Sequence, residues 1–323
     1  MSLRRRALLQ RLGVAALPAG LLPACSTLDP PQSAALRRQR PADLPVRVRL
    51  DQVPFVAQDD ELCGPATLAM LLQAAGLPGD LATLTREVYL PGRHGSLQAE
   101  MRAGARRHGA VAHRLDPDLP AALHEVAAGT PVLLLLNLAL PWWPRWHYAV
   151  LIGYDLDRHE AVLHSGQQSA TAWSLNTLEH TWARSGCWAM LALPPARLPQ
   201  QTSAADLTRA LLAFEAVQGP GATLPGWSTA LQRHPEVLAL QLGRGNALLA
   251  LTRNAEAAQQ FELAAQQHDS AAAWNNLAIS QSRLGQTDAA RQALTHALQR
   301  ARSAEPIWLS AVEQTREELQ LGD

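Results

Sequence analysis

Apolar and polar positions divide the chain into two parts with different periodicities. From about residue 48 to 198, short apolar runs alternate with helical patterns, and the runs at 131–138 and 148–153 predict buried strands. Beyond about residue 200 the pattern is helical almost throughout and rich in Ala, Leu and Gln. A proline-rich stretch, Leu193–Pro199, separates the two parts. The sequence therefore predicts an α+β domain over residues 48–198, followed by an all-α domain over residues 199–323.

The helical part repeats itself. Residues 251–257 align with residues 284–290 at an offset of 33 positions. Ala264 and Ala297 are related by the same offset. Small residues at such positions let paired helices approach closely.

The later repeat carries Trp274, small residues such as Ala278, and a turn glycine, Gly285. This pattern resembles the tetratricopeptide (TPR) repeat. The resemblance predicts two to three TPR-like units and a terminal helix over residues 307–321, an array whose concave face would bind a peptide or a partner protein. An unrelated helical bundle with accidental self-similarity is the alternative.

The first 47 residues lack the periodicity of a folded domain. Arginines at positions 4–6 precede a short apolar stretch, residues 12–24. Such a stretch is typical of an export signal and is shorter than the roughly 20 apolar residues of a membrane span. Residues 1–25 are therefore predicted to be a signal peptide. Residues 26–47, rich in Pro, Gln, Arg and Ser, are predicted to form a flexible tether.

The signal ends in Leu-Pro-Ala-Cys25, which resembles the lipobox of bacterial lipoproteins. The resemblance implies that Cys25 becomes the acylated N-terminus. The protein would then be anchored by lipid on the periplasmic side of the cell envelope, with the outer membrane favoured over the inner. A plain secretory signal with a chance cysteine is the alternative.

Composition and charge narrow the possible functions. The chain is 47% hydrophobic and 17% charged, as in a globular protein. Its 28 basic and 28 acidic residues cancel, which argues against a nucleic-acid surface built on bulk positive charge. The three cysteines, Cys25, Cys63 and Cys187, lack metal-ligand spacing. We therefore expect neither a structural metal nor a cofactor, and no nucleic-acid partner.

The most informative cysteine, Cys63, lies at the start of a predicted helix. Pro65 suits the first turn of that helix, and Gly76 ends it. The unpaired N–H groups and positive dipole end of a helix stabilise a thiolate there. Gln58, five residues earlier, can direct its amide to the same point, where it could hold a developing oxyanion.

A reactive thiol needs a base, and His147 opens the predicted strand at 148–153. Its position alone favours a half-buried histidine satisfied by a backbone carbonyl over a catalytic base. Trp142, Trp143 and Trp146 precede it in one loop. These tryptophans either wall a substrate groove or pin the loop onto the sheet.

The segment Gln58-x4-Cys63-Gly-Pro-Ala-x3-Met, followed some 80 residues later by His147-Tyr-Ala-Val, resembles the papain-like cysteine peptidases of the bacteriocin-processing, double-glycine leader type. The resemblance extends over roughly residues 50–195. It implies a papain-like α+β fold with Cys63 as nucleophile, His147 as general base and acid, and Gln58 as oxyanion-hole donor.

One position departs from that family, in which an Asp usually orients the base. Folding the hairpin about Leu156 brings Ser165, or His164 one residue off, opposite His147. A serine can accept a hydrogen bond from the imidazole but supplies no carboxylate charge. The nearest carboxylates, those of Asp155 and Asp157, are interpreted as turn residues.

Two further features are expected to be structural. Cys187 is interpreted as a small apolar residue on a core strand. Arg102, Arg106 and Arg107 are interpreted as a solvated helix face.

The sequence thus predicts an envelope cysteine peptidase that hydrolyses a peptide or protein substrate through a Cys63 thioester. Its TPR array would bind substrate or an envelope protein partner. The missing Asp leaves an alternative: a catalytically weak or inactive, peptidase-like lipoprotein that binds peptides or acts as a scaffold.

Overall fold

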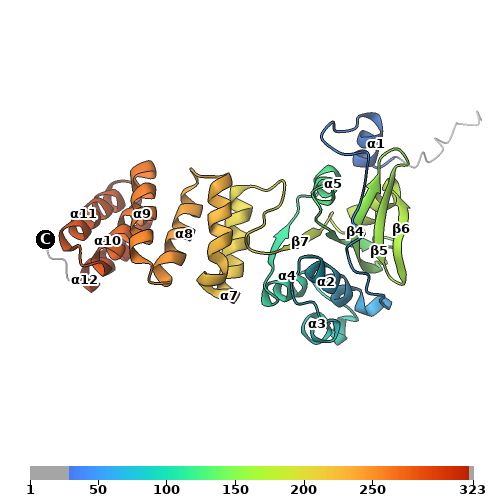
Figure 1. Ribbon diagram of the computed structural model, residues 1–323, viewed down its shortest axis with the longest axis horizontal. Helices are drawn as coiled ribbons and strands as arrows, with labels where there is room; N and C mark the ends of the chain where they lie inside the picture. The colour runs from blue at the N-terminus through green and yellow to red at the C-terminus, as the bar shows by residue number, and fades with distance from the viewer. Residues whose placement is uncertain (1–28, 320–323) are drawn as a thin grey trace, which may run out of the picture.

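The computed structural model describes residues 29–319. The predicted signal peptide and the predicted lipidation at Cys25 lie outside the described residues. Within the described range, no helix has both the length and the apolar character needed to cross a membrane. Figure 1 shows a sheet with its surrounding helices at one end of an elongated molecule, and a row of helices at the other.

One seven-stranded sheet organises the N-terminal part, and its strand pairs are antiparallel. The strand order is β2-β7-β3-β4-β5-β6, and β1 pairs with β4. The strands are β1 (Arg47–Arg49), β2 (Val111–Arg114), β3 (Val132–Asn137), β4 (Trp146–Asp155), β5 (Glu160–Ser165), β6 (Gln168–Ser174) and β7 (Ala189–Leu193). Helices α2, α5 and α6 pack on β3, which is buried along its whole length. This two-sided burial explains why its sequence is a continuous apolar run.

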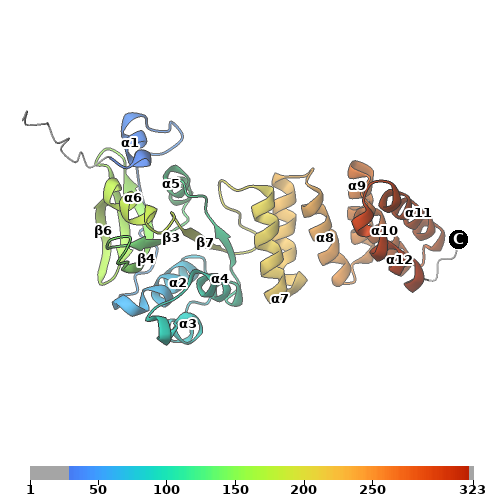
Figure 2. The ribbon, with the colours of Figure 1, turned by 180° about the vertical axis from the view of Figure 1, so that it is seen from behind.

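Helices surround this sheet on both sides. They are α1 (Pro31–Arg38), α2 (Cys63–Ala74), α3 (Leu81–Val88), α4 (Gln98–Arg107), α5 (Leu119–Ala127) and α6 (Leu175–Ala183), with short 3-10 turns at Asp60–Leu62 and Pro91–Arg93. In Figures 1 and 2, α2, α3 and α4 gather on one side, and α1 and α5 lie on the other. Because α2 packs against β3, β4 and β7 and is covered by α3 and α4, every residue from Cys63 to Leu72 is buried.

Residues 29–47 do not form the predicted flexible tether. Helix α1 packs on α5 and α6, where the backbone N–H and the hydroxyl of Ser33 both donate to the Glu179 carboxylate. The hydroxyl lies 2.6 Å from that carboxylate, and Ser33 is 1% exposed. Strand β1 then joins the sheet beside β4. The tether prediction failed because the docking partner lies 146 residues further along the chain.

The β4–β5 hairpin turns at Asp157 and Arg158, and not about Leu156 as predicted. Asp155 pairs with Glu160 across the turn. The Asp155 carboxylate accepts the backbone N–H groups of Asp157 and Arg158 at 3.1 and 3.0 Å. Asp155 is therefore a turn residue, as the sequence indicated.

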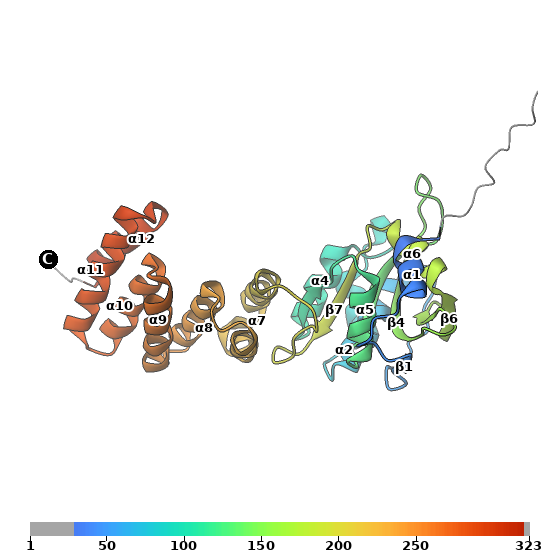
Figure 3. The ribbon, with the colours of Figure 1, turned by 90° about the horizontal axis from the view of Figure 1, so that it is seen from above.

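The C-terminal part is all-helical. It comprises α7 (Ala204–Arg233), α8 (Leu238–Ala250), α9 (Asn254–His268), α10 (Ala271–Arg283), α11 (Thr287–Ser303), a 3-10 turn at Pro306–Trp308 and α12 (Leu309–Glu318). Figure 3 shows these helices following one another away from the sheet. Helix α7 is kinked at Gly219, whose φ of 80° lies outside the α-helical range. The predicted boundary between residues 198 and 199 falls in the connection between β7 and α7.

The helical part contains two successive helix pairs with the same layout. Helix α10 begins 33 residues after α8 (271 − 238), and α11 begins 33 residues after α9 (287 − 254). Consecutive helices pack tightly at small residues: a Cβ on Gly245 would overlap the Phe261 ring. Ala264 and Ala297 are fully buried. These contacts are compatible with helical repeats, because helices can approach so closely only where the side chain is small.

Candidate active site

Cys63 is the first residue of α2. The residue after it, Gly64, must be small: a Cβ there would overlap the Ser96 side chain and come 3.2 Å from the Met101 sulfur. Pro65 fits the first turn, where its missing N–H is not needed. The Cys-Gly-Pro sequence therefore starts the helix at the thiol and lets the loop that precedes α4 pack against it.

Gln58 contacts the backbone of Cys63 directly. Its side-chain nitrogen donates to the Cys63 carbonyl at 2.9 Å, and its side-chain oxygen accepts the Gly166 N–H at 3.2 Å. The Gln58 backbone N–H also donates to the Gly166 carbonyl, at 3.2 Å. Gln58 thus joins the start of α2 to the turn between β5 and β6. An amide nitrogen carries two N–H groups, and the bond to the Cys63 carbonyl uses one of them.

Ser165 lies beside His147. The sequence predicted that either Ser165 or His164 would take this place. The His147 Nε2 atom is 2.8 Å from the Ser165 hydroxyl. Val150 pairs with His164 between β4 and β5, so continuing that register sets Ser165 opposite Ala149. Alternate residues of a strand share a face, so Ser165 lies on the face of His147 and His164 on the other.

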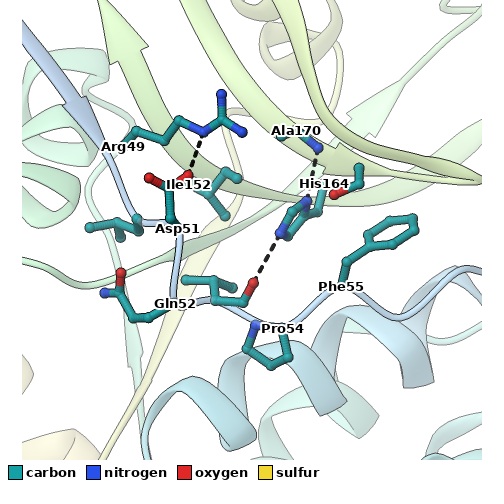
Figure 4. Close-up of a pocket in the computed structure, with 11 residues that line it drawn as sticks. Arg49, Asp51, Gln52, Pro54, Phe55, Ile152, His164 and Ala170 are labelled. Atoms are coloured by element: carbon teal, nitrogen blue, oxygen red, sulfur yellow. Dashed lines mark hydrogen bonds and ion pairs between the residues drawn. The ribbon is translucent and has the colours of Figure 1, made fainter.

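The second candidate, His164, lines a separate cavity of about 340 Å³ (Figure 4). There its Nε2–H donates to the Val53 carbonyl at 3.2 Å, and its Nδ1 accepts the Ala170 N–H at 3.0 Å. Burial lowers the pKa of His164. Both ring nitrogens are satisfied by backbone, so His164 is a neutral structural residue that joins β5 to β6 and to the loop that follows β1.

The four predicted site residues form one connected cluster. Gln58 links the Cys63 backbone to Gly166, which follows Ser165, and Ser165 contacts His147. The exposed fractions of these side chains are 4% for Gln58, 5% for Cys63 and His147, and 9% for Ser165. In such a water-poor site, electrostatic interactions are stronger than in solution.

Tyr148 gives a second link between β4 and the cysteine. Burial and, next, the charge of Cys63 raise the pKa of the Tyr148 phenol. That hydroxyl donates to the Ser96 carbonyl at 3.2 Å. Tyr148 therefore fixes the Ser96 loop beside the cysteine. Sequence reasoning missed this role; a tyrosine directly after the candidate base, and a Gly-Ser pair before α4, were the available signals.

The loop before His147 exposes its tryptophans. Trp142, Trp143 and Trp146 are 77%, 78% and 52% exposed. The expectation that these aromatics might pin the loop onto the sheet is therefore wrong. They instead form an exposed apolar surface at the start of β4, the strand that carries His147.

Cys187 does not lie on a core strand as predicted. It precedes β7 in a turn, with a φ of 50°, and is partly exposed. Burial raises the pKa of its thiol, with Glu179 adding to the effect. It is not joined to Cys63 by a disulfide.

Part of the chain is similar to known proteins. Residues 50–190 match the family model described as Peptidase_C39 like family. One similar solved structure is described as a C39-like peptidase from Bacillus anthracis; it is 21% identical, covers 46% of this chain and 97% of its own, and superposes with a TM-score of 0.40. No curated protein matches the chain. The family match and the helix-covered antiparallel sheet indicate a cysteine-peptidase-like domain.

Proposed function

We propose that this protein is an envelope cysteine peptidase that cleaves peptide bonds through a thioester on Cys63. The observation that carries the proposal is the buried cluster in which Gln58 contacts the Cys63 backbone and Ser165 contacts His147. The family match over residues 50–190 supports the same chemistry.

In the proposed first step, His147 takes the Cys63 proton and the thiolate attacks the carbonyl carbon of the substrate. Because Nε2 of His147 is engaged by Ser165, the proton exchange is assigned to Nδ1. The carbonyl oxygen becomes an oxyanion, which the second N–H of Gln58 and the backbone N–H of Cys63 stabilise. The tetrahedral intermediate then collapses as the imidazolium gives its proton to the leaving amine, and a thioester remains.

In the second step, His147 removes a proton from water, and the hydroxide attacks the thioester. The C–S bond breaks, the acid product leaves and the Cys63 thiol is restored. The three exposed tryptophans before His147 are proposed to contact apolar side chains of the substrate.

A second function is supported by one observation: Ser165 stands where a carboxylate would stabilise the imidazolium. A neutral partner orients the ring but contributes no charge. The alternative function is therefore a peptidase-like domain that binds peptides with weak turnover or none. In either case we propose that the helical part is a TPR array that binds substrate or an envelope partner. We also propose that lipid at Cys25 anchors the protein on the periplasmic side of the envelope, with the outer membrane favoured over the inner.

Cleavage of a peptide library by the full chain in detergent micelles, followed by mass spectrometry, tests the proposal. We expect products that disappear in the Cys63→Ala variant. Products that persist in that variant would assign the cleavage to another site or a contaminant. Peptides that bind without being cut would favour the alternative.

Labelling by iodoacetamide tests the site separately from the substrate. If His147 activates Cys63, the thiol should react at pH values well below about 8.5, the ordinary pKa of a cysteine thiol. The His147→Ala variant should lose that reactivity. A Cys63 that labels only as an ordinary thiol would contradict the enzyme proposal.

A further inference from the structure

A second cavity, of about 530 Å³, lies where the sheet part meets the helical part. Helix α4 and strand β2 form one wall, and the start of α7 forms the other; α4 and α7 contact each other (Figures 1 and 2). Its charged and polar lining consists of Arg102, Arg106, His113, Arg114, Asp116, Thr202, Asp206 and Arg209. The volume is within the range of small-molecule sites, about 300–1,000 Å³.

Two arginines of α4 reach this cavity, and neither has an ionic partner within residues 29–319. Arg102 and Arg106 are one helical turn apart and partly buried, and the Nε of each is buried without a hydrogen-bond partner in the described residues. Burial, and then the neighbouring charge of Arg102, lowers the pKa of Arg106. By contrast, the exposed Arg107 pairs with Glu87 at 2.8 Å. The interpretation of these arginines as a solvated face therefore holds for Arg107 alone.

A buried histidine also lines the cavity with an unused nitrogen. His113 on β2 is 3% exposed, and its Nε2 has no partner in the described part of the chain. Burial lowers the pKa of His113 to about 4, so the ring is neutral near neutral pH. A neutral imidazole can carry its proton on Nε2 and so donate it to a ligand.

The acidic residues of the cavity do not balance the arginines. Asp206 is already bound by Arg209 and by the Ser203 hydroxyl. Asp116 is exposed, and no ion pair joins it to Arg114 in the described residues. Four arginines and two aspartates leave two positive charges (4 − 2). A partly buried charge without a counter-ion is costly, which applies here to Arg102 and Arg106.

We propose that this cavity is a binding site for a small molecule that carries two negatively charged oxyanion groups. Guanidinium groups of Arg102 and Arg106 present planar forks that fit phosphate or carboxylate oxygens, and the unpaired Nε atoms would become donors. His113 adds a neutral donor from strand β2, on the same wall of the cavity. Because α7 closes the cavity, the ligand would stiffen the junction between the sheet part and the helical part.

Calorimetric titration of the full chain in detergent micelles tests this site, with inorganic pyrophosphate as one probe and citrate as the other. Ionic strength is held constant with sodium chloride. We expect saturable binding of at least one probe and a matching rise in thermal stability, because the ligand binds only the folded state. Pyrophosphate binding would identify a phosphate site, and citrate binding a carboxylate site. Binding of neither probe at millimolar concentration would overturn the proposal.

The variant Arg106→Met distinguishes a ligand role from a structural one. Methionine keeps much of the length of the side chain but removes the charge, so we expect affinity to fall about tenfold or more. The melting temperature without ligand should stay the same or rise, because repulsion with Arg102 is removed. Arg107→Met on the same helix is the matched control and should keep full affinity. Undiminished affinity in Arg106→Met would refute the site.

The test is independent of peptidase activity. Cys63→Ala removes the proposed nucleophile, yet it should bind the same probe with wild-type affinity. A wild-type chain that binds an anion probe but cleaves no peptide would refute the proposed function alone. A wild-type chain that cleaves peptides but binds neither probe would refute the cavity alone.

Discussion

Replacing Ser165 by Asp supplies the carboxylate that the site lacks. The Ser165 hydroxyl is 2.8 Å from His147 Nε2, and both residues are at most 9% exposed. Two unit charges about 4 Å apart attract by about 4 kcal/mol at an effective dielectric constant of about 20. Burying the carboxylate offsets much of this gain. We therefore expect a net preference of about 1–2 kcal/mol for the thiolate–imidazolium pair, or about a tenfold larger population.

Room for the longer side chain comes from the neighbouring turn. Gly166, with a φ of 59°, has no heavy atom within 4 Å of a Cβ built on it, so there is open space beside this turn. The matched control is Ser165→Asn, which has the size of Asp without its charge. Any difference between the two variants therefore measures the charge.

The rate of iodoacetamide alkylation as a function of pH is the assay. Ser165→Asp should alkylate about tenfold faster than the wild type near neutral pH, while Ser165→Asn should not exceed it. Peptide cleavage by Ser165→Asp should rise in parallel. Equal rates for the Asp and Asn variants, with both folded, would show that charge at this position does not control the thiol.

Three further predictions concern stability and substrate. Burial raises the pKa of Glu125 from its ordinary value of 4.5 to about 7, so its contribution to stability is complete below pH 4.5 and is lost as pH rises through 7. In urea unfolding, the free energy of unfolding of the wild type should fall by up to about 3 kcal/mol between about pH 5 and 8, and Glu125→Gln should not show this fall. An equal change with pH in both proteins would contradict this. Gly245→Ala should destabilise the helices by about 1–3 kcal/mol through overlap with Phe261, and an unchanged melting temperature would argue against the close packing. Trp142→Ala with Trp143→Ala should raise KM for apolar peptides without lowering thermal stability, and an unchanged KM would remove these tryptophans from the substrate site.

Local patterns sufficed for the elements that position the thiol. The Gly-Pro pair after Cys63 and the apolar spacing that follows predicted the start of α2, where the structure has it. Continuous apolar runs predicted β3 and β4 because both strands are buried on two faces. The offset of 33 residues also matches the observed helix bounds.

The failures share one cause, which is contact between segments distant in sequence. Ser33 is ordered by Glu179, and no local pattern links the two. Arg102 and Arg106 lie on the polar side of α4, which is a solvated face until α7, about a hundred residues later, covers it. The place of Ser165 depended on hairpin register, which shifts between Leu151 and Gly153 and left His164 as an open alternative.

The hydroxyl of Ser165 preserves one of the two roles of a carboxylate partner and omits the other. It fixes the imidazole plane through Nε2, so the orientation of the base is retained. It adds no charge, so a thiolate–imidazolium pair would depend on the helix end and on the water-poor surroundings. Replacing the carboxylate by a neutral group in a serine triad slows catalysis about 10⁴-fold, partly because the histidine adopts the wrong tautomer. A serine hydroxyl can donate or accept and so imposes no tautomer, and a thiol ionises more readily than an alcohol. The loss for Cys63 should therefore be smaller, which favours a slow peptidase over an inert binding domain.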